Sequence, residues 1–299
     1  MPELFTCPHC GTKTLVDDKY RGQTGRCVSC NAVISIPNFD VGDVQRDVGR
    51  TTRRVVAFVA SASVILVLIA IFVTQVVRVG GSSMQRIANN RVRGQSIANL
   101  EKIAKALNNY AADHGRYPPP VVKDAKGKPM HSWRVMLLPY LQEDDLFNQY
   151  DTQRAWNDPA NLNLQYAIPA VFQHPLHTPG SFQSDYYLVT GPQTLFPKGG
   201  PLSPDDLVDS PAQTILVVEA MPIVPSGSWT EPIDLGIGGI TGDLTVGSAA
   251  EPGGLSPGGV TVVTVDGRGH FVPDNFEPST VRALLTPAGG ERLRDDTLD

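Results

Sequence analysis

The 299-residue sequence predicts an α+β protein built from three parts: a small N-terminal cysteine module, one transmembrane helix, and a domain in which the continued helix packs on an antiparallel β-sheet. Three observations lead to this prediction. All four cysteines lie within the first 30 residues, residues 55–77 contain no charged side chain, and the hydrophobic pattern changes from helical to strand-like beyond Trp156. A chain of this length is expected to form about two domains.

The cysteine module, residues 1–36, carries the most specific chemical motif. Cys7 and Cys10 form one Cys-x-x-Cys pair, and Cys27 and Cys30 form a second pair, with 16 residues between the two pairs. Two such pairs about 15–20 residues apart are typical of a zinc ribbon, in which four thiolates bind one structural zinc ion. The module contains few large apolar residues, so zinc binding would supply its folding energy.

The residues after each pair fit this prediction, and two alternatives to a structural zinc ribbon stay open. Gly11 and Asn31 tolerate the left-handed backbone that such loops need. Paired cysteines also hold iron or act as redox centres. The basic residues of the module would suit a nucleic-acid-binding ribbon, although Asp17 and Asp18 interrupt them. These basic residues are Lys13, Lys19, Arg21 and Arg26.

Residues 37–54 are expected to form a linker, and residues 55–77 a transmembrane helix. As a helix the uncharged run is about 34 Å long, enough to cross a hydrocarbon core of about 30 Å. Arginines flank the run equally on both sides, so the charge rule gives no orientation. Thiolates persist in a reducing cytosol, and we therefore expect a single-pass protein in a bacterial cell membrane, in contact with the lipid bilayer, with a cytoplasmic N-terminus and an extracytoplasmic C-terminal domain.

The predicted outer domain, residues 82–299, begins with an amphipathic helix that ends at His114-Gly115. A shorter helical stretch follows, interrupted at Pro139. Beyond it, short apolar runs between Gly, Pro and Asp predict antiparallel strands, and Asp266-Gly267 predicts a two-residue hairpin turn. Residues 236–259 are expected to form a long loop, and the segment STVRALL a short helix near the C-terminus. The apolar stripe of the first helix consists of Ile97, Leu100, Ala104, Leu107 and Ala111.

The composition of the large domain argues against several function classes. Residues 79–299 contain 16 Lys/Arg against 24 Asp/Glu, so no nucleic-acid partner is expected. The sequence lacks a nucleophile elbow, a phosphate loop and a His-Glu-x-x-His motif, so no enzyme is expected and no catalytic residue is assigned. Glu219 and Asp234 are too far apart in sequence to be identified as a carboxylate pair. An acidic cluster either binds calcium or is simply solvated. It consists of Asp205, Asp206 and Asp209.

Six segments of the large domain, in order, resemble a large bacterial family of pilin-like membrane proteins that is abundant in planctomycetes. This family is catalogued as domain of unknown function 1559 and is known for a signature of His, nine residues and Asp-Gly. The resemblance covers roughly residues 85–292 and implies a pilin-like helix packed on a sheet. The segments are NLEKIAKALNNYAADHGRYPP, SWRVMLLPYLQEDDLF, DSPAQTILVVE, WTEPIDL, VTVVTVDGRGHFV and LLTPAGGE.

The chain departs from the pattern of this family at three positions. Ser256 stands where the signature has its histidine, and Ser96 and His174 stand where the family has cysteines. The joint loss of both cysteines fits a paired role in the family, such as a disulfide. Many relatives also begin with a prepilin leader, whose glutamate is missing here, so the resemblance does not imply assembly into a fibre.

These observations predict a membrane-anchored, pseudopilin-like structural or interaction protein whose zinc ribbon docks a protein partner, with a homo-oligomer as a further possibility. The alternative is a membrane sensor or receptor whose outer domain binds a ligand at residues 236–259. An enzyme is the third hypothesis.

Overall fold

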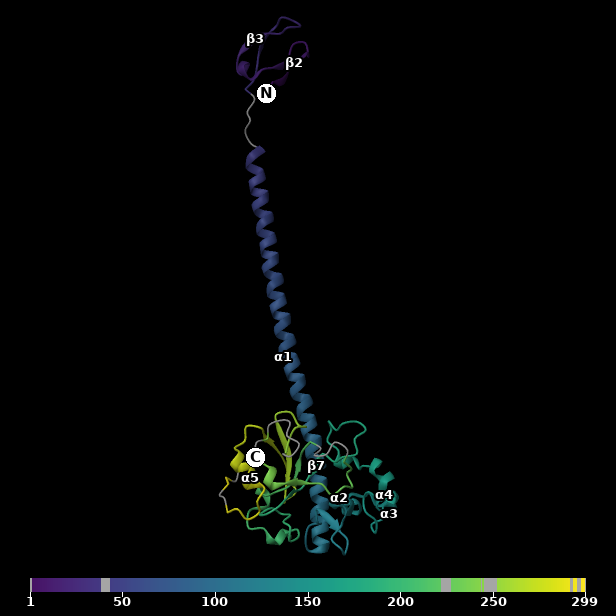
Figure 1. Cartoon of the computed structure of the whole chain (residues 1–299). Helices are drawn as coiled ribbons and strands as arrows, with labels where there is room; N and C mark the ends of the chain where they lie inside the picture. Colours follow the sequence, from purple (N-terminus) through teal and green to yellow (C-terminus); the bar gives the residue numbers. More distant parts are fainter. Residues whose placement is uncertain are drawn as a thin grey trace. The chain divides into compact units, whose positions relative to one another are not determined.

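The computed structural model describes residues 2–38, 44–221, 227–242, 244, 252–290, 293–294 and 297–298. The chain divides into two compact units, Met1–Gly80 and Gly81–Asp299. Helix α1 (Val44–His114) contributes residues to both units, and its first residues overlap the predicted linker. Several elements of each unit are labelled in Figure 1.

The first unit begins with two small antiparallel hairpins. Strand β1 (Glu3–Thr6) pairs with β2 (Lys13–Val16), and β3 (Thr24–Arg26) pairs with β4 (Val33–Ser35). A short 3-10 turn, η1 (Asp18–Tyr20), lies between the hairpins. Within residues 2–38 the buried side chains are Cys7 and Cys27. This part of the chain therefore has no apolar core of the usual kind.

The prediction of a transmembrane helix is wrong. Residues 55–77 lie within α1, but among the described residues no helix is long and apolar enough to cross a membrane. For the same reason, the predicted single-pass location in a bacterial cell membrane, with a cytoplasmic N-terminus and an extracytoplasmic C-terminal domain, is not supported.

The second unit is an α+β domain built on a four-stranded antiparallel sheet. The strand order is β12-β11-β9-β7, and α1 runs beside the sheet (Figure 1). Ser96 of α1 contacts Thr261 of β11, and the side chain of Asn108 donates to the carbonyl of Val265 just beyond this strand. The expected packing of an amphipathic helix on an antiparallel sheet is therefore confirmed. The strands are β7 (Tyr186–Tyr187), β9 (Ile215–Glu219), β11 (Gly259–Thr264) and β12 (Gly269–Pro273).

Alternation along β11 divides the apolar interior into two clusters, because neighbouring strand side chains point to opposite faces of a sheet. Val263 belongs to the cluster that contains the stripe of α1, including Leu100 and Leu107. Val260 and Val262 belong to the second cluster, which contains Val281 and Leu284 of helix α5 (Pro278–Leu284). The sheet is thus covered by apolar side chains on both faces, and the short helix expected near the C-terminus is confirmed.

Short elements link α1 to the sheet. The helical stretch interrupted at Pro139 is confirmed as three pieces: α2 (Trp133–Met136), η2 (Leu138–Leu141) and α3 (Asp144–Gln149). Strands β5 (Val121–Lys123) and β6 (Pro129–Ser132) form a hairpin, and β8 (Val189–Thr190) pairs in parallel with β10 (Leu235–Gly236). The remaining short helices are α4 (Pro159–Leu162), η3 (Asn163–Tyr166), η4 (Ala170–Phe172), η5 (Pro204–Asp206), η6 (Pro211–Gln213) and η7 (Ile237–Gly239).

Two local predictions can be compared residue by residue. The stop of α1 at His114 is confirmed, because Gly115 has φ +75° and its N–H donates to the carbonyl of Ala111. The β11–β12 hairpin also forms, but its loop has three residues instead of two. Thr264 accepts from Gly267, and Gly267 alone takes a positive φ, +87°. A type I turn followed by a left-handed glycine matches the strand twist equally well.

Candidate functional site

The four cysteines of the first unit form the candidate metal centre. Each Cys-x-x-Cys pair lies in the loop of one hairpin, and Gly11 (φ +71°) and Asn31 (φ +57°) supply the left-handed residues, as expected. The N–H of Gly11 donates to Cys7 O, and that of Asn31 donates to Cys27 O. The same hydrogen-bond pattern in both loops brings the sulfur atoms of all four cysteines within 4.8 Å of one another.

The sulfur spacing fits a single tetrahedral ion. The Sγ atoms of Cys7 and Cys30 are 3.9 Å apart, and those of Cys10 and Cys27 are 3.8 Å apart. Four sulfurs at about 2.3 Å from a central zinc would lie about 3.8 Å from each other in a tetrahedron. These four residues could therefore bind a metal ion, although iron–sulfur bonds of similar length would give a similar spacing.

The electrostatic interactions among the four cysteine side chains also favour a bound cation. The hydroxyl and the N–H of Thr12 lower the pKa of Cys10 to about 6. The pKa of Cys30 is raised to about 12, because the neighbouring cysteine sulfurs and burial outweigh the lowering effect of the Ala32 N–H. Four thiolates so close together repel one another, and a divalent cation removes that repulsion.

A groove of about 500 Å³ lies between the two hairpins of the same unit. Its lining includes Phe5, Val16 and Ile34, so it is largely apolar. Several large apolar side chains of this unit are exposed, among them Val28 at 85% and Leu15 at 65%. Exposed apolar surface of this density on a small unit is typical of a protein-binding surface.

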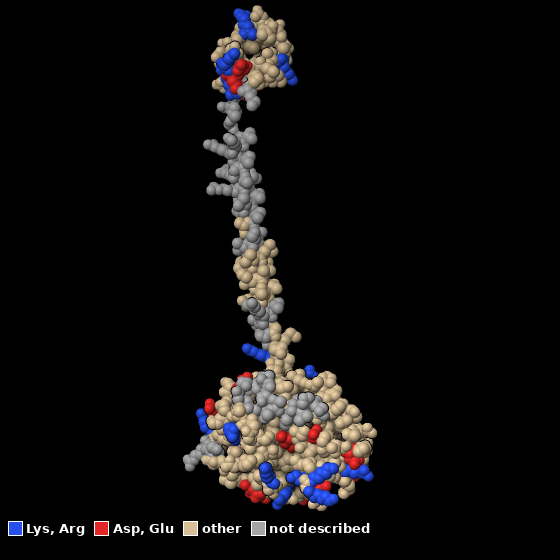
Figure 2. All heavy atoms as spheres, viewed as in Figure 1, with Lys and Arg blue, Asp and Glu red and all other residues tan. Residues whose placement is uncertain are grey.

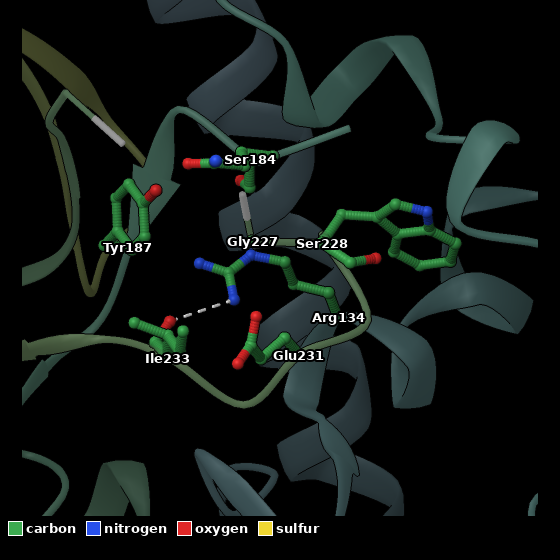
Figure 3. A pocket seen from close by; sticks show the side chains of 9 residues that line it. Arg134, Ser184, Tyr187, Gly227, Ser228, Glu231 and Ile233 are labelled. Carbon is green, nitrogen blue, oxygen red and sulfur yellow. Dashed lines mark hydrogen bonds between the residues drawn. The ribbon is translucent and has the colours of Figure 1, made fainter. Parts of the chain in front are cut away.

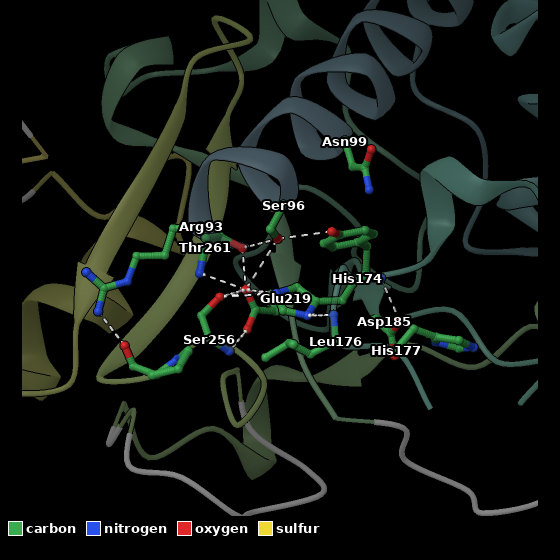
Figure 4. A network of polar contacts seen from close by, with 12 residues as sticks. Arg93, Ser96, Asn99, His174, Leu176, His177, Asp185, Glu219, Ser256 and Thr261 are labelled. Atoms are coloured by element: carbon green, nitrogen blue, oxygen red, sulfur yellow. Dashed lines mark hydrogen bonds and ion pairs between the residues drawn. The ribbon is translucent and has the colours of Figure 1, made fainter. Parts of the chain in front are cut away.

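In the second unit, Glu219 at the end of β9 is the centre of a buried polar cluster (Figure 4). Its carboxylate accepts from the N–H of Ser256 at 2.6 Å, from the Ser256 hydroxyl at 2.8 Å and from the N–H of Thr261 at 3.2 Å. The Thr261 hydroxyl donates to the same carboxylate, and Ser96 Oγ lies 3.5 Å away. The five donors can compensate the lost hydration of a buried carboxylate. We name this group the Glu219 cluster.

His174 completes the Glu219 cluster from the loop after η4. The N–H of Leu176 donates to Nδ1 of His174 at 3.1 Å, so the ring hydrogen is assigned to Nε2. Nε2 faces the Ser256 hydroxyl at 3.2 Å and the Glu219 carboxylate at 3.7 Å. Burial lowers the pKa of His174, although the charge of Glu219 opposes this effect. The ring is therefore neutral and donates one hydrogen bond.

Asp185 joins His174 to a second histidine. It accepts from the N–H of His174 at 2.8 Å and lies 2.5 Å from Nδ1 of His177. The other ring nitrogen of His177 faces the carbonyl of Ser181 at 3.2 Å and must donate to it. Burial raises the pKa of Asp185, against the effect of these donors. His177 and Asp185 therefore form a short polar contact in a nearly closed site.

Arg134 and Asp234 form a separate buried ion pair, with side chains 1% and 3% exposed and an N–O distance of 3.3 Å. The indole N–H of Trp133 donates to both carboxylate oxygens at 3.0 and 3.1 Å, and the N–H of Leu188 donates at 2.9 Å. Burial raises the pKa of Asp234 to about 6, because these donors and the charge of Arg134 only partly offset the lost hydration. Asp234 is therefore still a carboxylate at neutral pH.

A small cavity of about 20 Å³ lies beside Arg134 (Figure 3). Ser184, Ser228 and Glu231 contribute polar groups to its lining. Nε of Arg134 is buried and has no hydrogen-bond partner within the described part of the chain. The volume suits one water molecule, which would need polar partners of this kind. The cavity is too small for a metabolite.

The other predicted site residues have structural roles. Asp206 accepts from the N–H of Ser203 and closes the N-terminus of η5, and Asp209 accepts from the N–H of Gly289. Neither belongs to a potential metal-binding group among the residues that the structure describes. Glu219 and Asp234 lie in separate clusters. The predicted ligand loop, residues 236–259, falls partly outside the described residues, at positions 243 and 245–251.

The three positions at which the sequence departs from the family that it resembles lie together in the Glu219 cluster. Ser96, His174 and Ser256 all lie within 3.7 Å of the Glu219 carboxylate. They come from α1, from the loop after η4 and from the segment before β11. Sequence patterns alone do not identify this cluster, because its members are up to 165 residues apart. The one signal that could indicate it is the departure from the family pattern at all three positions together.

Comparison with known proteins finds a family match within the second unit. Residues 93–203 match the model of a family described as "Protein of unknown function (DUF1559)". No curated protein and no solved structure matches the chain. The matched region contains most of the packed part of α1, the α2–α3 segment and strands β7 and β8. Over this region the chain is similar to the DUF1559 family of proteins of unknown function.

Proposed function

We propose that this chain is a non-enzymatic, pseudopilin-like structural or interaction protein whose N-terminal unit is a zinc ribbon that docks a protein partner. The observation that carries the proposal is the placement of the four cysteines. Their sulfurs have the spacing of a tetrahedral zinc site, and Cys7 and Cys27 are the buried side chains of residues 2–38. A unit with so little apolar core depends on a metal for its fold.

Zinc is proposed over iron because of the surroundings of the site. The residues between the paired cysteines are Pro8, His9, Val28 and Ser29, none of which is Phe, Tyr or Trp. Zinc is the usual ion of a closed four-cysteine site in a ribbon of this kind. Such an ion is structural, because four thiolates fill its coordination shell and leave no open position for a substrate.

The groove between the hairpins is the proposed docking surface, and its occupant is an extended, apolar peptide of a protein partner. Support comes from the apolar lining of the groove and from the exposed side chains of Val28 and Leu15 near it. Strands of two-stranded sheets also have free edges to which an extended peptide can add. The alternative, a sensor whose ligand binds at residues 236–259, remains a prediction.

Site-specific photo-crosslinking in the full-length chain tests the docking role. A photoreactive residue at Val28, which lines the groove, is expected to capture one discrete protein. The same residue at the exposed Lys13, outside the groove lining, is the control and should not capture it. Changing Cys27→Ser together with Cys30→Ser should abolish capture. Equal crosslinking from both positions, or capture that persists without the cysteines, would show that the ribbon is not the docking module.

A further inference from the structure

A groove of about 550 Å³ on the second unit has the composition of a docking surface. One wall is a single face of α1, with Lys102, Lys105 and Asn109 at helical spacing. The opposite wall consists of residues 140–143 and 170–171, which include the apolar Leu141 and Val171 but also Glu143. Both lysines are exposed, so the groove combines apolar side chains with two cationic groups and one carboxylate and has a net positive charge.

A turn of the same unit, residues 203–209, has the complementary composition. Asp205 and Asp206 are exposed, and Val208 is 75% exposed. Figure 2 shows acidic and basic side chains interspersed over the visible face of the second unit. Recognition by this unit is therefore expected to depend on local complementary patches, such as this turn and the groove, more than on its net charge. We name this segment the acidic turn.

Hydrogen bonds hold the acidic turn in one conformation. Ser203 and Asp206 form a capping box at η5. The N–H groups of Val208 and Asp209 both donate to the carbonyl of Pro287 at 3.0 Å. A preorganised turn loses little conformational entropy when it binds. The exposed apolar side chain is therefore presented rigidly between carboxylates.

We propose that the acidic turn of one copy of this chain docks into the groove of a second copy. Val208 would pack on Leu141 and Val171, and Asp205 would face Lys102 and Lys105. The two surfaces consist of different residues, so the contact is head-to-tail and can repeat from copy to copy. The inference rests on the structural half of the proposed function and does not involve the ribbon metal.

The test is position-specific crosslinking between copies of the full-length chain. A photoreactive residue at Val208 is placed in isotopically labelled chain, which is mixed with unlabelled chain, and the crosslinked peptides are identified by mass spectrometry. The expected products join position 208 of one copy to residues 102–109, 140–143 or 170–171 of the other. Crosslinks between copies that map elsewhere, or no crosslinks between copies at high concentration, would overturn the proposal.

Charge reversal supplies the second arm of the test. Lys102→Glu with Lys105→Glu should reduce the crosslink yield at least tenfold, and combining this chain with one that carries Asp205→Lys should restore it. Asp206 is left unchanged because it caps η5. Lys123→Glu with Lys126→Glu is the matched control, since these lysines are exposed but outside the groove. An equal loss in the control would overturn the proposal.

The ribbon variant separates this inference from the docking role of the ribbon. Cys27→Ser with Cys30→Ser should leave the crosslinks from position 208 unchanged, because the groove and the acidic turn both belong to the second unit. Loss of these crosslinks in the ribbon variant would show that self-association runs through the ribbon, which contradicts the head-to-tail contact.

Discussion

Replacing Asp234 by Asn tests whether the buried ion pair organises the second unit. The change keeps the size of the side chain but removes its charge, so Arg134, which is 1% exposed, becomes a buried cation without a counter-ion. Breaking a buried pair in this way costs about 3–5 kcal/mol. For a domain of this size each kcal/mol lowers the melting temperature by about 2–4 °C, so a decrease of about 6–20 °C is expected.

Tryptophan emission is a suitable assay, because all three tryptophans of the chain lie in the second unit, at positions 133, 156 and 229. Urea unfolding followed in this way reports the second unit and not the ribbon. Asp151→Asn is the matched control, since its ion pair with Arg154 is largely exposed and is expected to contribute less than about 1 kcal/mol. A loss below about 1 kcal/mol for Asp234→Asn would refute the reasoning.

A double variant refines this prediction. Arg134→Met with Asp234→Leu removes both charges, so the penalty of an unpaired buried cation disappears. Recovery should be partial, because Trp133 Nε1 and the N–H of Leu188 lose their acceptor, at a cost of about 1–3 kcal/mol each. A double variant less stable than Asp234→Asn would contradict the ion-pair account.

Three further outcomes are expected. Glu219→Gln should cost about 2–4 kcal/mol in urea unfolding because its amide N–H₂ would face hydroxyl and N–H donors, whereas the exposed Glu277→Gln should cost almost nothing. The pKa of His174 is lowered in the folded state, so the stability that this residue contributes is present above the unfolded pKa of about 6.5 and is lost on acidification. Between pH 7 and pH 5 the His174→Asn variant should therefore lose less stability than the parent. Parallel profiles of stability against pH would argue against this. Gly259→Ala should destabilise more than Gly267→Ala in thermal unfolding, because a Cβ at Gly259 would lie 2.2 Å from the Val272 carbonyl oxygen while one at Gly267 meets nothing within 4 Å; equal losses would refute the clash.

Local sequence signals predicted the local structure. The stop of α1 at Gly115, the break at Pro139 and the two cysteine loops depend on the backbone preferences of single residues, which the sequence contains directly. The hairpin at Asp266-Gly267 was placed correctly, but its loop has one residue more than expected. Asp-Gly is compatible with both loop lengths, so the pair alone could not distinguish them.

Contacts between residues far apart in the sequence could not be predicted from local sequence patterns. The Glu219 cluster joins Ser96 to Thr261, and the Arg134 ion pair joins residues 100 positions apart. Neither cluster has a periodic pattern, because its members lie on different elements that only the tertiary fold brings together. The transmembrane prediction failed in another way. It used the absence of charge over residues 55–77, and no helix of the described residues meets the length and apolarity that a membrane span needs.

Metal analysis of the purified full-length chain tests the central claim, that the N-terminal unit folds around one zinc ion. The account predicts one zinc per chain, a colourless protein, and nuclear magnetic resonance signals of the two hairpins that collapse in the Cys27→Ser, Cys30→Ser variant while the tryptophan emission of the second unit stays unchanged. Bound iron with a visible charge-transfer band, or hairpins that remain folded without any metal, would contradict it.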